Sequence, residues 1–161
     1  MNKLNKQQIV DYFNRSYKAV DGLWFMKVEK KYGFDSALEI DAEVWTVMGK
    51  IQARMMKVFL GHENNPNVLF ESLVTKLEIE GFRFTAEKTE NGFRIKIDDC
   101  PWHNLMIKSG RKHLSRIIGK NVCSTEYQAW ISELANSMKF EFKSQICCDS
   151  KKCIIDFIEQ H

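Results

Sequence analysis

The sequence is poor in proline, glycine and long apolar runs, and each shortage excludes a class of protein. Two prolines and eight glycines among 161 residues exclude a collagen-like or proline-rich chain. The longest continuous apolar runs have four residues, as at 23–26, so the sequence predicts no transmembrane helix and no membrane partner. Residues 1–8 are polar and lack the apolar core of a signal peptide, so we expect a cytoplasmic protein.

A strong charge of one sign is also missing. The chain carries 24 basic and 21 acidic side chains, a net charge of +3, which argues against a nucleic-acid partner. Its composition is globular, with 44% apolar and 28% charged residues. A chain of this length can bury most of its apolar surface without cross-links. We therefore expect a single domain over 1–161, with a helical half at about 6–80 and a mixed half at about 82–158.

Apolar residues recur at helical spacing through the first half. Three helices are predicted, over about 6–32, 35–60 and 67–80. A glycine is placed to end each of them, at Gly33, Gly61 and Gly81, and a polar loop starts at His62. Asp21-Gly22 interrupts the first helix, which is therefore either one kinked helix or two. The second helix is apolar around most of its circumference, which predicts a buried central helix.

The second half contains stretches with a period of two. Four strands are predicted, at about 82–87, 93–97, 138–146 and 153–158. Asn91-Gly92 between the first two strands is a strong hairpin signal, and the last two strands form a second hairpin. The pattern predicts an α+β fold, in which a helical N-terminal half packs on a four-stranded antiparallel sheet made of two hairpins.

Two further helices are predicted between the hairpins. One starts at Pro101 and runs to about 118, and the other is capped by Thr125 and runs to about 136. This map places Cys123 just before a helix and Cys100 at the start of one.

All five cysteines lie at or after Cys100, and their number is odd. A secreted disulfide scaffold would be shorter with an even count, so we expect free thiols in a reducing compartment. The predicted elements place the thiols at element ends, where two that bracket a hairpin turn can approach one ion. The candidate metal ligands are Cys100, Cys123, Cys147, Cys148 and Cys153, with the choice between Cys147 and Cys148 left open. The cofactor would be zinc or iron, with an iron–sulfur cluster as the weaker option, and buried inert thiols are the alternative.

Three residues of the same region are candidate catalytic groups. Cys100 stands at a predicted helix start, where a lowered pKa would make its thiolate a nucleophile. His103 is its candidate base or a metal ligand, and a hydrogen bond at the helix start is the alternative. Glu126 is a candidate general base or carboxylate ligand, or else an acid in a first helical turn that balances the helix dipole.

Tryptophans and a basic helix face are the remaining candidates. Trp24, Trp45 and Trp102 can line a pocket for a flat or apolar ligand, or fill the core. The basic face is either a solvated surface or an anion site, and it comprises Lys108, Arg111, Lys112, His113 and Arg116. The sequence has no phosphate-binding loop, dinucleotide fingerprint or nucleophile elbow.

Taken together, these segments resemble a family of uncharacterised small cysteine-containing domains of anaerobic bacteria and archaea. The residues that carry the resemblance are Asp21-Gly22-Leu23-Trp24-Phe25, Cys100-Pro101-Trp102, Cys123 with Glu126-Tyr127, and Cys147-Cys148 with Cys153. More distantly, the chain is similar to the L-2-amino-thiazoline-4-carboxylic acid hydrolase family. Its second half is also similar to the 4-vinyl reductase domain, which implies a cysteine-containing metal site beside a small-molecule pocket.

These signals predict a metal-thiolate domain that binds a small molecule beside the cysteine cluster. The alternative is a hydrolase that opens a C–N or C–S bond of a thiazoline-like or amide substrate, with metal-bound water or Cys100 as the nucleophile. A third alternative is an interaction protein whose basic helix face docks a partner. Whether there is catalysis, and whether the chain forms a homodimer, both stay open.

Overall fold

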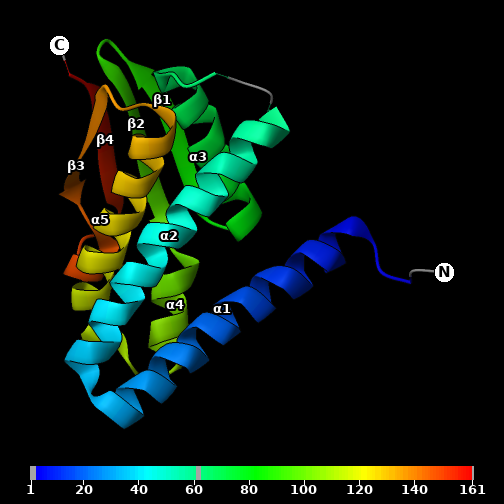
Figure 1. Cartoon of the computed structure of the whole chain (residues 1–161), viewed down its shortest axis with the longest axis vertical. Helices are drawn as coiled ribbons and strands as arrows, with labels where there is room; N and C mark the ends of the chain where they lie inside the picture. Colours follow the sequence, from blue (N-terminus) through cyan, green and yellow to red (C-terminus); the bar gives the residue numbers. More distant parts are fainter. Residues whose placement is uncertain (1–2, 61–62, 161) are drawn as a thin grey trace. The chain divides into compact units, whose positions relative to one another are not determined.

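A computed structural model describes residues 3–60 and 63–160 of the chain (Figure 1). The predictions that concern Gly61 and His62 lie outside these residues. The chain divides into two compact units, Met1–Asp41 and Ala42–His161, which we call unit 1 and unit 2. The described residues form five α-helices and four strands in an α+β fold. None of the described helices is long and apolar enough to cross a membrane.

Unit 1 consists of α1 (Lys6–Tyr32) and the first turns of α2 (Phe34–Leu60). α1 is a single helix that runs through Asp21-Gly22, so the two-helix alternative is wrong. Gly33 alone separates α1 from α2, and its φ of 90° is a conformation that favours glycine. The predicted role of this glycine as the end of the first helix is therefore confirmed.

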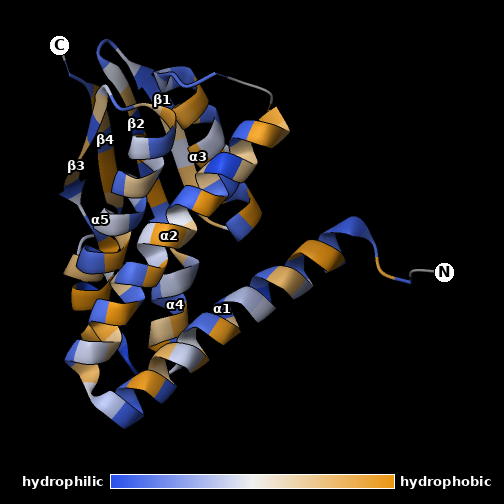
Figure 2. Cartoon of the chain, in the orientation of Figure 1, coloured by the Kyte–Doolittle hydropathy of each residue, from blue (hydrophilic) through white to orange (hydrophobic). Residues whose placement is uncertain are grey.

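α2 continues into unit 2 with two different faces. On one face Trp45, Gly49 and Ala53 are buried, and a Cβ added to Gly49 would stand 2.9 Å from the Cβ of Ala129 on α5. Figure 2 shows hydrophobic residues recurring along the whole helix. Several of them are exposed, namely Val44, Val47, Ile51, Met55 and Val58. The prediction of a buried central helix is wrong, because the apolar residues cover two faces and one of them is exposed.

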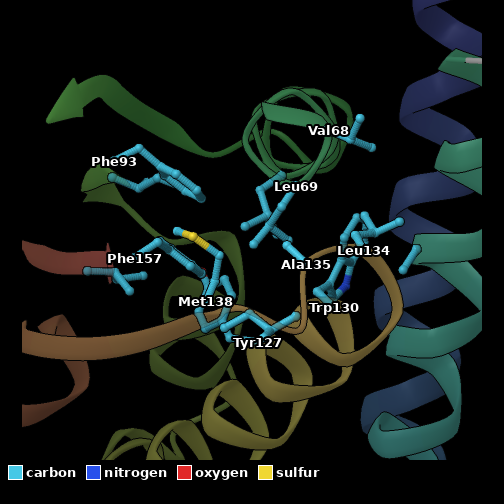
Figure 3. Close-up of a cluster of buried hydrophobic side chains, with 14 of the residues drawn as sticks. Val68, Leu69, Phe93, Tyr127, Trp130, Leu134, Ala135, Met138 and Phe157 are labelled. Atoms are coloured by element: carbon cyan, nitrogen blue, oxygen red, sulfur yellow. The ribbon is translucent and has the colours of Figure 1, made fainter. Parts of the chain in front are cut away.

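α3 (Pro66–Glu80) and α5 (Ser115–Leu134) cover one face of the sheet (Figure 1). α3 ends at Gly81, which has a left-handed conformation with a φ of 81°, as predicted. The two helices and the sheet enclose the hydrophobic core (Figure 3). Its labelled members are Val68, Leu69, Phe93, Tyr127, Trp130, Leu134, Ala135, Met138 and Phe157. Burial of these large apolar side chains is the dominant favourable contribution to folding.

The sheet is antiparallel, with the strand order β1-β2-β4-β3. Its strands are β1 (Arg83–Thr89), β2 (Gly92–Asp99), β3 (Met138–Ser144) and β4 (Cys153–Glu159). The two predicted hairpins, β1–β2 and β3–β4, are both confirmed. The predicted alternation of buried and solvent-facing side chains along β2 is also confirmed, because Phe93, Ile95 and Ile97 are buried. The opposite face is polar and carries ion pairs such as Arg94–Asp156.

The helices between the hairpins differ from the prediction. α4 (Pro101–Lys108) is short, because Gly110 adopts a φ of 72° and turns the chain soon after it. α5 then runs unbroken to Leu134, so Cys123 lies inside a helix rather than just before one. The predicted cap at Thr125 is wrong, because this residue also lies inside the continuous helix.

Candidate functional site

The cysteines gather at one end of the sheet in unit 2. Cys100 follows β2, and Cys153 begins β4, the strand beside it. Cys147 and Cys148 lie in a 3₁₀ turn just after β3. Cys123 lies on α5 one helical turn after Gly119, which is in close contact with Cys147. Burial raises the pKa of the Cys123 thiol well above its ordinary value. All five are free thiols and are partly buried.

The arrangement of these thiols does not form a metal site. Among residues 3–60 and 63–160, no three His, Cys, Asp or Glu side chains are placed so that they could hold one ion. Cys147 and Cys148 are a close pair, with 4.0 Å between their Sγ atoms. The Sγ atom of Cys153 instead accepts a hydrogen bond from the backbone N–H of Ile146, at 3.2 Å. Thiols are chemically suitable ligands for zinc or iron, but these described side chains do not converge on one ion. Zinc and iron therefore stay predictions.

Burial raises the pKa of four of these thiols and keeps them protonated at neutral pH, namely those of Cys100, Cys123, Cys147 and Cys153. It raises the pKa of Cys100 to about 11, although the backbone N–H groups of His103 and Trp102 act in the opposite direction. Burial, followed by the neighbouring Cys148, raises the pKa of Cys147 to about 12. The predicted lowering of the Cys100 pKa is therefore wrong, because the cost of burying the charge outweighs the helix start. This environment does not favour a thiolate nucleophile at Cys100.

His103 is fixed between two helices. Its Nδ1 atom lies 2.7 Å from Oγ of the buried Ser115, at the start of α5. Burial, followed by the nearby Lys112, lowers the pKa of His103, so the ring is neutral at pH 7. The hydrogen bond ties α4 to α5, and it agrees with the structural alternative predicted for His103.

Glu126 belongs to a buried ionic cluster on α3 and α5. Nζ of Lys76 lies 2.9 Å from Oε1 of Glu126 and 3.1 Å from Oε2 of Glu80. Lys76, Glu80 and Glu126 are 5%, 5% and 9% exposed, and we call them the ionic cluster. Glu126 lies well inside α5, so the prediction that it stands in a first helical turn is wrong. Sequence reasoning missed Lys76 and Glu80 altogether.

The charges of the ionic cluster depend on one another. Burial raises the pKa of Glu126, and the ammonium group of Lys76 acts against this shift. Burial also lowers the pKa of Lys76, but Glu126 and Glu80 outweigh it, so this pKa ends above its ordinary value. Lys76 is therefore charged at neutral pH and holds both carboxylates.

The tryptophans are divided between the two units. Trp45 is buried in unit 2 and packs edge to face against Trp102, with 5.5 Å between the ring centroids. This contact supports the core alternative for both residues. Trp24 belongs to unit 1 and is exposed. A pocket lined by all three tryptophans stays a prediction.

An open cleft lies beside the cysteine cluster. Its volume is about 550 Å³, and it is lined by Gly110, Lys112, His113, Arg116, Cys147 and Asp149. We call it the basic cleft. The first four residues come from the start of α5 and the turns before it, and the last two come from the β3–β4 connection. The cleft therefore joins part of the predicted basic helix face to the cysteine cluster.

The approach of the β3–β4 connection to α5 depends on a glycine. A Cβ added to Gly119 would stand only 2.8 Å from Sγ of Cys147, closer than real Cβ atoms come. The absence of a side chain at Gly119 therefore lets Cys147 reach the helix and form one wall of the basic cleft.

The basic cleft is electrostatically suited to an anion. Lys112 and Arg116 supply positive charge, and Asp149, which is largely exposed, lies 3.6 Å from Arg116. The lining thus carries two cationic side chains against one carboxylate.

A second groove lies between α3 and β1, with a volume of about 500 Å³. It is lined by Phe70, Val74, Glu78, Phe82, Arg83, Phe84, Thr85 and Ala86. Its floor is mostly apolar, and sequence reasoning did not single it out. The aromatic residues on it share the alternating pattern of core residues, so periodicity alone could not separate groove from core.

Fold and site together define a small α+β domain with an open, positively charged cleft beside a cluster of neutral thiols. The chain belongs to a family of unknown function, DUF6125, whose family model matches residues 2–158. No curated protein matches it. The resemblances to the thiazoline hydrolase family, to the 4-vinyl reductase domain and to domains of anaerobes stay predictions.

One solved structure shares the fold. It is described as the crystal structure of the phenol-responsive sensory domain of the transcription activator PoxR with phenol. The TM-score is 0.57 with 13% sequence identity, over 88% of this chain and 73% of that chain. At this identity the likeness concerns the fold alone.

Proposed function

We propose that unit 2 is a small-molecule-binding domain and that its ligand, a small organic anion, occupies the basic cleft. The observation that carries this proposal is the convergence of Lys112 and Arg116 on one open cavity. Ligand sites combine a cavity of this size with a few polar groups that fix orientation. The likeness to a sensory domain crystallised with phenol supports a small organic molecule as the ligand class.

The charge of the cleft favours a carboxylate over a neutral ring. Arg116 presents a planar guanidinium that can hold a carboxylate through two hydrogen bonds. Its present partner is the exposed Asp149, at 3.6 Å, so a ligand carboxylate can replace this contact at little cost. An aromatic carboxylate satisfies both the size and the charge of the cavity.

The proposal is tested with two probes that differ in one group. Isothermal titration of the full chain with benzoate and with phenol should show tighter binding of benzoate, by about 10- to 100-fold. Hydrogen bonds to charged groups of about 1.5–3 kcal/mol give this range. Arg116→Glu and Lys112→Glu should abolish benzoate binding. Lys108→Glu, on the predicted basic face but outside the cleft lining, is the matched control and should bind as the natural chain does. Equal binding by all variants, or no binding of either probe, would contradict the proposal.

Metal binding by the cysteines stays a prediction beside this proposal. Its support is the gathering of thiols at one end of the sheet, where the Sγ atoms of Cys147 and Cys148 are 4.0 Å apart. Elemental analysis of protein purified without oxygen and without a metal-affinity tag tests it, and Cys153→Ser should then lower both the metal content and the melting temperature. Hydrolysis of a thiazoline-like or amide substrate gains no support, since Cys100 is protonated and Glu126 is held by Lys76.

A further inference from the structure

α2 exposes a continuous apolar stripe in unit 2. We call it the α2 stripe, and it consists of Val44, Val47, Ile51, Met55 and Val58. These side chains are between 44% and 77% exposed. Their spacings of three and four residues place them on one face of the helix. A row of exposed apolar residues on a helix marks an interaction surface more often than a set of scattered ones does.

The rest of unit 2 fixes the direction in which the α2 stripe faces. Trp45 and Ala53 are buried on another face of α2, and Gly49 lies in close contact with Ala129 of α5. Arg54 is bound to Glu133 of α5 by two hydrogen bonds of 2.8 Å. Because these contacts hold α2 against α5, rotation of the helix to bury the stripe would expose Trp45 instead.

The charges beside the α2 stripe are arranged with opposite signs at its two ends. Glu43 is exposed next to the first residue of the stripe, while Lys50 and Lys57 flank its second half. All three charges lie on one flank of the stripe, because they are seven residues apart. In a parallel pair these flanks would lie on opposite sides of the interface and would not meet. In an antiparallel pair, Glu43 of each helix lies near Lys57 of the other. The two Lys50 side chains lie near the axis and oppose association, whereas the two Glu43–Lys57 pairs favour it. The ends of the surface are therefore complementary to themselves under a twofold axis, as a symmetric dimer requires.

We propose that the α2 stripe binds the same stripe of a second copy of this chain, with the two helices antiparallel and crossing near Ile51. This goes beyond the proposed ligand function and does not depend on it. The stripe spans 15 residues, and its first and last Cα atoms are separated by about 21 Å of helix at 1.5 Å per residue. Such an interface is at the small end of specific protein interfaces, below roughly 1,200 Å² in total, so the dimer is weak and depends on concentration.

Sedimentation equilibrium of the full chain over a range of micromolar concentrations tests the proposal. The natural chain should show a monomer–dimer equilibrium. Ile51→Glu places two carboxylates at the twofold axis and should weaken the dimer by about tenfold or more. Ile117→Glu is the matched control, because Ile117 on α5 is 43% exposed against 45% for Ile51, and it should dimerise normally. Circular dichroism checks that both variants are folded.

A charge exchange tests the antiparallel geometry separately. Glu43→Lys and Lys57→Glu should each weaken the dimer, since each places like charges opposite one another. The double variant should restore it, which loss of folding could not mimic. A chain that is monomeric at every concentration would overturn the proposal. The same holds if this monomer binds anionic lipid vesicles, because the stripe would then be a membrane-binding surface. Failure of the double variant to recover would overturn the antiparallel pairing.

Discussion

The α3–α5 interface holds Lys76, Glu80 and Glu126, and the neighbouring end of the sheet holds the five thiols. Burial is the largest effect on the thiols of Cys100 and Cys123, and it raises both pKa values. The two groups are also close enough to act on each other. Lys76 lowers the pKa of Cys100, and Glu126 raises the pKa of Cys123. Burial opposes charge in both places. In the ionic cluster an opposite charge compensates for it, whereas the thiols avoid the cost by staying neutral.

This difference separates two kinds of buried polar group. A buried ion pair depends on every member, so removing one leaves an uncompensated charge. A buried neutral thiol behaves as a small apolar side chain, and its loss removes packing alone. The ionic cluster should therefore govern stability and its pH dependence, and the thiols should respond to changes in packing.

Removing the lysine should have the largest effect. Lys76→Met leaves Glu126 buried without the ammonium group that faces it, and we expect the free energy of unfolding to fall by about 3–5 kcal/mol. Urea denaturation at pH 7 measures it. Lys120→Met, at an exposed position of α5, is the control and should change stability by less than about 0.5 kcal/mol. Similar small effects for both variants would contradict the dependence of the ionic cluster on the charge of Lys76.

A methyl group beside Cys147 should have a smaller effect. Gly119→Ala brings a Cβ within 2.8 Å of the Cys147 Sγ atom, and overpacking of this kind costs about 1–3 kcal/mol. Gly22→Ala is the control, because Gly22 lies in the interior of α1 with no atom within 4 Å of an added Cβ. It should stabilise α1 by up to about 1 kcal/mol. Melting temperatures of the two variants should therefore move in opposite directions.

The pH dependence of stability should identify Glu126. Its pKa in the folded chain lies above the ordinary 4.5, so between the two values the folded chain holds a proton that the unfolded chain releases. The free energy of unfolding should therefore fall as pH rises through this window. Lys76 contributes no slope there, because its raised pKa keeps it charged.

Glu126→Gln should remove that slope while leaving an oxygen that can accept from Lys76. Urea denaturation between pH 4 and pH 8 compares the two chains. The hydrogen bond from Arg94 lowers the pKa of Asp156 below its ordinary value. The stability that Asp156 contributes is therefore lost only at a pH below the Glu126 window, and equally in the natural chain and in the Glu126→Gln variant. Parallel pH profiles for the two chains would assign the slope to another group.

Alkylation of the cluster thiols should be slow at neutral pH. This prediction concerns the reactivity of the thiols and not the stability of the fold. With a pKa of about 11, roughly one Cys100 in a thousand is a thiolate at pH 8, and only the thiolate reacts with iodoacetamide. Labelling of Cys100, followed by peptide mass spectrometry, should accelerate about tenfold per pH unit between pH 8 and pH 10. Rapid labelling at pH 7 would contradict the neutral state of this thiol.

Local pattern was enough to predict most of the sheet. The alternation of Phe93, Ile95 and Ile97 gives a strand with one buried face, and Asn91-Gly92 marks its turn. The helix break after α4 was misplaced, because a single glycine at Gly110 decides it and the capping pattern at Thr125 was a stronger but misleading signal. Local signals therefore predict elements better than their ends.

The ionic cluster and the basic cleft depend on contacts between distant parts of the chain. Lys76 and Glu80 are four residues apart on α3, a spacing equally typical of exposed ion pairs. Only the contact with Glu126 on α5 shows that they are buried. Likewise, no local signal places Arg116 beside Cys147, since Gly119 determines how closely the β3–β4 connection approaches α5.

The strand order β1-β2-β4-β3 has a consequence for how the chain folds. β4 is the last of these four strands to be synthesised, yet it lies between β2 and β3 and pairs with both. Until β4 is available, β2 has an unpaired edge and an apolar face, and β3 has no neighbour in the sheet. Such non-local pairing slows folding, and unpaired apolar edges invite association with other chains. Ribosome-bound chains that end before Cys153 should therefore bind chaperones, and release of the whole of β4 should complete the sheet in one step.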